Sequence, residues 1–116
     1  MRPSQIDFFG DGKAANGDSG IETLSGNLQA MSFQVYAKNG TTPTYTATLY
    51  GRLRKERQSD PTHVPEWVQL AQITSVTVTK LVSVTVRPDE VKVTISSYSG
   101  TGEVFAILSG HNVGSM

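Results

Sequence analysis

The residues that could carry out chemistry are few. The chain has only two histidines, His63 and His111, and no G-x-S-x-G pattern, so a hydrolase triad lacks its nucleophile turn. The adjacent carboxylates of Asp89 and Glu90 would point to opposite sides of an extended chain, which makes them a poor acid and base pair. Phosphate-loop and dinucleotide-binding fingerprints are also missing from the sequence. We therefore expect no enzymatic activity and no catalytic residues.

A glycine-rich segment over residues 10–20 is the one place that suggests a metal ion. Asp11, Asn16 and Asp18 could offer oxygen ligands to calcium. Their spacing does not match the EF-hand loop, and no glutamate stands at its last position. We interpret the segment as a solvated loop and expect neither a metal nor a cofactor.

Two features could serve binding instead. Arg52, Arg54, Lys55 and Arg57 form a basic run that could contact phosphates or an acidic protein surface, or could simply be a solvated strand end. Trp67 could be a sugar-stacking platform, a hot spot in a protein interface, or a lid over a sheet edge. Packing is favoured over sugar binding, because a platform needs a second coplanar aromatic and the sequence nominates none.

The amino-acid composition limits the classes of molecule that the protein could bind and the compartment in which it is made. Ten basic residues balance ten acidic ones, which argues against a general affinity for nucleic acid or acidic membranes. The absence of cysteine fits synthesis in a reducing cytoplasm, and the N-terminus lacks the apolar stretch of a signal peptide. With 116 residues, the chain fits one domain with a modest core.

The elements that must position these residues are strands. Valines alternate with threonine and serine over residues 76–86, and the alternation resumes over residues 91–95. Lys80-Leu81 interrupts the first run, which predicts either two short strands or one strand bent by a bulge near Lys80. The turn chemistry of Pro88-Asp89 lies between the two runs and predicts that they pair as an antiparallel hairpin. Residues 31–37 predict another strand, which ends at Asn39-Gly40, a strong hairpin signal.

Further strands are predicted over residues 44–54, 66–73 and 103–109. In the last of these, Val104, Ala106 and Leu108 occupy one face and Phe105 and Ile107 the other. A strand that is apolar on both faces is central in a layered core or is buried by another chain. The connection over residues 55–65 is longer than most hairpin loops, and we expect the charged residues 54–66 to form part of a docking surface.

About seven to nine short strands without helical periodicity predict an all-β protein, an antiparallel β-sandwich with jelly-roll or immunoglobulin-like connectivity. We expect a single domain over residues 1–116. An N-terminal arm covers about residues 1–20, where the aromatic pair Phe8-Phe9 could belong to a short strand or lie on a neighbouring surface. Residues 110–116 form a polar C-terminal tail.

Three segments of the chain resemble the small β-sandwich proteins of tailed-phage virions. They are TATLYGRL at 46–53, EWVQLAQI at 66–73 and VRPDEVKVTISSYSGTGEVFAILSG at 86–110. The shared order is a glycine-interrupted strand, a tryptophan strand, and a proline turn followed by a strand that ends in Ser-Gly. The resemblance carries no functional residue over to this chain.

The resemblance implies a non-enzymatic virion structural protein, made in the host cytoplasm, that decorates and cements a capsid. It implies the major capsid protein or another virion protein as partner, and a homo-oligomer, with a trimer favoured. The alternatives are a carbohydrate-binding module of a tail receptor-binding protein and a tail or head-tail structural protein. The candidate interface residues are Phe8, Phe9, Arg52, Arg54, Lys55, Arg57, Trp67, Phe105 and Ile107.

Overall fold

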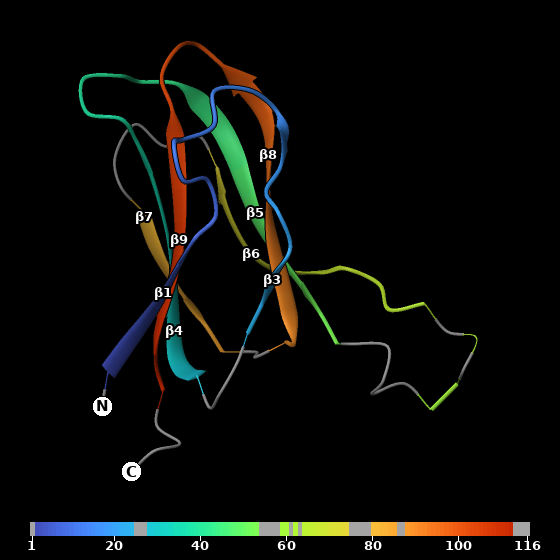
Figure 1. The fold of residues 1–116 in the computed structure, drawn as a ribbon. Coiled ribbons are helices and arrows are strands. Elements are labelled where there is room, and N and C mark those ends of the chain that lie inside the picture. Colours follow the sequence, from blue (N-terminus) through green and yellow to red (C-terminus); the bar gives the residue numbers. More distant parts are fainter. Residues whose placement is uncertain are drawn as a thin grey trace.

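The protein is an all-β sandwich of two antiparallel sheets (Figure 1). The computed structural model describes residues 2–24, 28–53, 59–60, 62, 64–74, 80–85 and 88–112. Within these ranges no helix is long and apolar enough to cross a membrane. The strands are β1 (Arg2–Asp7), β2 (Gly17–Asp18), β3 (Glu22–Thr23), β4 (Leu28–Ala37), β5 (Thr44–Arg52), β6 (Val68–Thr74), β7 (Lys80–Val84), β8 (Glu90–Ser99) and β9 (Val104–Asn112).

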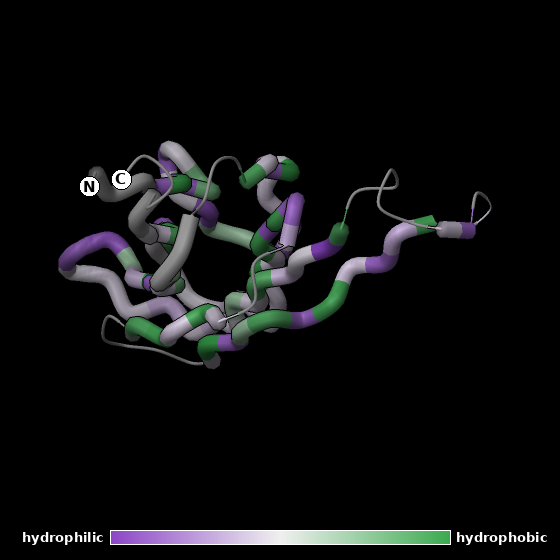
Figure 2. The backbone as a smooth tube through the Cα atoms, turned by 90° about the horizontal axis from the view of Figure 1, so that it is seen from below, coloured by the Kyte–Doolittle hydropathy of each residue, from purple (hydrophilic) through white to green (hydrophobic). Residues whose placement is uncertain are grey.

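One sheet has the order β1-β9-β4-β7, and the other has the order β2-β8-β5-β6, with β3 also paired to β8. The two sheets lie face to face, and apolar and polar residues alternate along the strands (Figure 2). This is the arrangement expected when each strand contributes alternate side chains to one buried layer. The predicted single β-sandwich fold is therefore confirmed.

The core lies between the sheets and draws on both. Its most completely buried members are at most 1% exposed: Phe33, Val35, Ala47, Leu49, Val91, Val93, Ile95, Val104, Ala106 and Leu108. Burying a Val, Leu, Ile or Phe side chain stabilises a fold by about 1.5 to 3 kcal/mol relative to leaving it exposed. One continuous apolar layer therefore holds the two sheets together.

The chain passes from one sheet to the other at nearly every connection. From β4 onward, only β5 and β6 are consecutive strands of the same sheet. An immunoglobulin-like sandwich keeps several consecutive pairs within one sheet, whereas a jelly roll built of two Greek keys alternates as this chain does. The connectivity is therefore that of a jelly roll.

This alternation corrects two predicted hairpins. β7 pairs with β4 in one sheet, while β8 pairs with β5 in the other, so the strands on either side of Pro88 belong to opposite sheets and do not form a hairpin. Asn39-Gly40 does form a turn, with the Thr41 N–H donating to the Lys38 carbonyl, and Gly40 has a φ of 84°. Asn39 lacks the positive φ that a type I′ turn requires, and the turn leads from β4 to β5 in the opposite sheet.

Both ends of the chain form more of the β-sandwich than the sequence predicts. β1 forms an edge of the first sheet along β9, and Phe8 and Phe9, each 7% exposed, belong to the protein's own core. Of the two roles left open for this pair, the structure shows packing within the chain, which leaves little of either ring exposed. β9 continues to Asn112, because pairing with β1 and β4 uses backbone groups and needs no apolar side chains, so the predicted tail loses residues 110–112 to the sheet.

Gly51 allows three elements to meet at one end of the second sheet. A Cβ atom at this position would lie 2.6 Å from Cγ of Pro88 and 2.7 Å from Cδ1 of Leu70. We predict that Gly51→Ala lowers the free energy of unfolding by about 1 to 3 kcal/mol, because the rigid proline ring cannot yield without moving the backbone. The matched control is Gly20→Ala, since a Cβ atom at Gly20 meets nothing within 4 Å.

Thermal unfolding of both variants tests this expectation. The melting temperature of Gly51→Ala should fall by roughly 4 °C or more, while that of Gly20→Ala stays close to the parent value. Equal melting temperatures for the two variants would show that the close approach at Gly51 does not constrain the fold.

Tyr45 carries an unusual buried hydroxyl. The side chain is 2% exposed, and its hydroxyl has no hydrogen-bond partner among the described residues. Burial raises the pKa of Tyr45 to about 12 from an ordinary value of 10. Between these two pH values the unfolded chain loses a proton that the folded chain keeps, so stability falls as the pH rises from about 10 to about 12.

We predict that Tyr45→Phe removes this part of the alkaline destabilisation. At neutral pH the variant should be at least as stable as the parent, because it no longer buries an unsatisfied hydroxyl. Urea unfolding of both proteins from pH 8 to pH 12 provides the measurement. Parallel stability curves above pH 10 would contradict the assignment to Tyr45.

Candidate binding surface

The inward side chains fill the core, so the residues available for binding lie mainly on the two outer sheet faces. We use the name tryptophan face for the outer face of the β2-β8-β5-β6 sheet around Trp67. Strand register places its residues in rows that run across the sheet. The rows are Asp18, Thr94, Thr48 and Gln72; then Lys92, Tyr50 and Gln69; and then Glu90 and Arg52, with Trp67 beside Arg52.

Trp67 lies over the charged side chains of this face. Cζ of Arg52 is 4.2 Å from the centroid of the indole ring, and Nζ of Lys92 is 4.9 Å from it. The same ammonium group lies 5.9 Å from the ring centroid of Tyr50. Both cations rise from one sheet face, so the indole rests on that face and gains cation–π attraction from each of them. Of the roles left open for Trp67, the structure shows packing within the chain.

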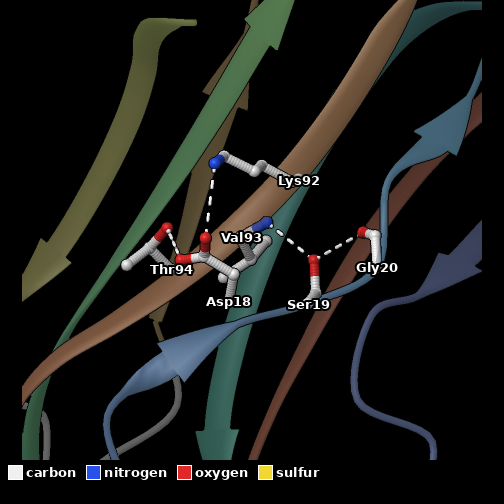
Figure 3. Close-up of polar contacts among 6 residues, drawn as sticks. All are labelled: Asp18, Ser19, Gly20, Lys92, Val93 and Thr94. Carbon is white, nitrogen blue, oxygen red and sulfur yellow. Dashed lines mark hydrogen bonds and ion pairs between the residues drawn. The ribbon is translucent and has the colours of Figure 1, made fainter.

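Each cation beneath Trp67 is also paired with a carboxylate. Nε of Arg52 donates to Oε1 of Glu90 at 2.8 Å, between side chains that are 26% and 22% exposed. Nζ of Lys92 donates to Oδ2 of Asp18 at 3.3 Å (Figure 3). The four charges sum to zero, so the face has local polarity without a net local charge.

Asp18, in β2, is held in place by the neighbouring strand β8. The Thr94 hydroxyl donates to its Oδ1 at 2.7 Å, and this hydrogen bond, together with Lys92 and Lys13, holds the pKa of Asp18 below its usual value. The backbone next to it is fixed as well, because the Ser19 N–H donates to the Val93 carbonyl and the Val93 N–H donates to Oγ of Ser19 (Figure 3). Asp18 is thus a hydrogen-bonded part of the face, and the segment that we interpreted as a solvated loop includes a strand, β2, that is paired with β8.

A bulge in β6 decides which residues share a face with Trp67. Simple alternation along the strand would put Gln69, Ala71 and Ile73 on the side of Trp67, but Leu70 is an extra residue in β6 between the pairs Leu49–Ala71 and Tyr50–Gln69. A bulge reverses the parity of the residues that follow it, so Ile73 is buried, whereas Gln72 joins the outer face. Tyr50 supplies the second aromatic ring of the face. Only the strand register shows that it lies on the same face as Trp67.

The outer face of the other sheet has a different character. Its apolar strip consists of Tyr36, Phe105, Ile107 and Leu81. The rings of Tyr36 and Phe105 stack with centroids 5.1 Å apart and planes at 17°. Ile107 lies in a row with Gln34 and Leu81, and Leu81 is 63% exposed. The second apolar face predicted for β9 is therefore only partly covered by this chain.

The charged residues 54–66, which we call the charged loop, lie largely outside the described residues. This holds for Arg54, Lys55 and Arg57, and for His63 in the same connection. Arg52 is described, and it turns toward Glu90 and Trp67. The described residues of the connection project away from the sandwich (Figures 1 and 2), with Val64 71% exposed. The docking role of the loop stays a prediction.

The described residues contain no group of three or more His, Cys, Asp or Glu side chains that could hold a metal ion. A scan against protein-family models finds no match to the chain, and a search of the curated proteins finds no relative. We therefore infer the function from the geometry of the two outer faces and from the sequence resemblance.

The Asp18 network generates a prediction about pH. We expect Thr94→Val to raise the pKa of Asp18 toward its ordinary value, because the hydroxyl that stabilises the carboxylate is removed. A carboxyl with a lowered pKa stabilises the folded state above its ordinary pKa, and this contribution is lost as the pH falls. The chemical shift of the Asp18 carboxyl carbon, followed by NMR from pH 2 to pH 7, measures the change. Thr46→Val is the control, and an unchanged Asp18 pKa in Thr94→Val would refute the role of Thr94.

Proposed function

We propose that the protein is a non-enzymatic virion structural protein, a capsid decoration or cement subunit that stabilises a phage head. The proposal combines the sequence resemblance with a structural feature, the apolar strip. Structural subunits act by covering one another's surfaces, and exposed apolar side chains gathered on one face of a small protein commonly mark an interaction site. A jelly-roll architecture fits this role, although many functions share that fold.

The apolar strip supports assembly with further copies of the chain. Tyr36 and Phe105 supply large apolar rings and Leu81 a protruding aliphatic side chain, which are residue types suited to the core of an interface. Closed symmetry is the usual form of soluble homo-oligomers. We take a trimer as the working assembly and the major capsid protein as the partner that it contacts.

The proposal predicts that the purified protein is a homo-oligomer and raises the temperature at which heads that lack it release their DNA. Replacing Leu81 and Ile107 together with serine should give a monomer and abolish this stabilisation, because both changes make the strip polar. Light scattering measures the mass, and dye fluorescence during heating follows DNA release. Ile21→Ser is the matched control, since Ile21 is 52% exposed but lies off the strip.

Mass spectrometry of fractionated virions determines where the protein resides. Recovery with heads supports the decoration role, whereas recovery with tails or necks would replace it with the tail-protein alternative. A monomeric protein that is absent from purified virions would refute the proposal.

A further inference from the structure

We propose that the tryptophan face is a binding site for a neutral saccharide. This inference goes beyond the structural role proposed above and does not depend on it. Trp67 and Tyr50 lie on the same sheet face, a placement that the sequence did not reveal. The single ammonium group of Lys92 lies 4.9 Å from the ring centroid of Trp67 and 5.9 Å from that of Tyr50, so the two aromatic side chains flank one lysine.

Aromatic rings on an open sheet face suit a sugar because the C–H groups of a pyranose pack against an apolar ring while its hydroxyls point outward. Trp67 and Tyr50 are half-buried, so each ring is held by its neighbours and still has accessible surface. Arg52 and Lys92 lie against the indole and fix its position. The platform is therefore ordered before any ligand arrives, which reduces the entropic cost of binding.

Hydrogen-bonding groups surround the two rings. Among the described residues, the Tyr50 hydroxyl and the exposed Gln69 amide have no hydrogen-bond partner, and Glu90 uses only one carboxylate oxygen. The Gln72 amide is oriented by donating to the Thr48 hydroxyl at 3.0 Å, which leaves its carbonyl oxygen free to accept. A saccharide offers closely spaced hydroxyls that can both donate to these acceptors and accept from these donors.

The charges of the face favour an uncharged ligand. Arg52 is already paired with Glu90, and Lys92 with Asp18. An anionic ligand would have to compete with two carboxylates, and burying a like charge beside them would be unfavourable. A neutral saccharide can bind to these ion pairs without breaking them.

The tryptophan face stays accessible when a partner covers the apolar strip. The two surfaces lie on opposite outer faces of a two-layer sandwich, so a partner on the strip does not cover Trp67. A subunit that is bound to a partner through the apolar strip can therefore still bind a glycan on the tryptophan face.

Trp67 is the only tryptophan of the chain, so its fluorescence reports on the site directly. We expect saturable changes in emission when the full-length protein is titrated with at least one member of a panel of neutral oligosaccharides. The panel comprises β-glucan, α-glucan, xylan, mannan and N-acetylglucosamine oligomers. Isothermal titration calorimetry with the responding sugar then gives affinities for the variants.

Trp67→Ala should weaken binding about tenfold or more, because it removes the platform. Tyr36→Ala, which removes an aromatic side chain from the opposite sheet, should leave the affinity unchanged. Should Trp67→Ala not fold, Gln69→Ala replaces an exposed side chain and is expected to weaken binding severalfold. The inference is overturned if no sugar of the panel changes the emission at millimolar concentration, if Trp67→Ala and Gln69→Ala bind like the parent, or if only sulfated or carboxylated glycans bind and do so in a salt-dependent way.

Discussion

The apolar layer between the two sheets is the constraint on which the rest of the structure depends. Strands β4 and β9 supply Phe33, Val35, Val104 and Leu108 from one side, and β5 and β8 supply residues such as Leu49 from the other. Because each strand turns alternate side chains to this layer, the remaining ones form the outer faces. The chemistry of each outer face can therefore vary while the core stays the same.

The period of two along the chain was enough to predict the sheet class and most of the buried residues. It could not predict which strands pair, because a strand that faces its neighbour across the core has the same alternation as one that lies beside it. The turn residues at Asn39-Gly40 and Pro88 were equally uninformative, since they allow a reversal within a sheet and a crossing between sheets. Pro88 is buried against Gly51, a contact that becomes visible only when both sheets are in place.

The candidate site was predictable only in part, for the same reason. Trp67 and Arg52 stand out in the sequence as an isolated tryptophan and the start of a basic run. Their joint position with Lys92 and Tyr50 depends on the register of three strands and on the bulge at Leu70. A single inserted residue in β6 decides which side chains share the face with Trp67, and such an insertion leaves no clear mark in an alternating sequence.

The ion pairs of the tryptophan face contribute more to order than to stability. Exposed ion pairs are typically worth about 0 to 1 kcal/mol, because they lose side-chain entropy and are screened by solvent. Here the indole lies against Arg52 and Lys92, while Glu90 and Asp18 hold their charged ends. Each cation therefore has both a ring and a carboxylate to fix its position, so its long side chain has few alternative conformations. The core determines whether the chain folds, and this network determines how rigidly the folded chain presents Trp67 at its surface.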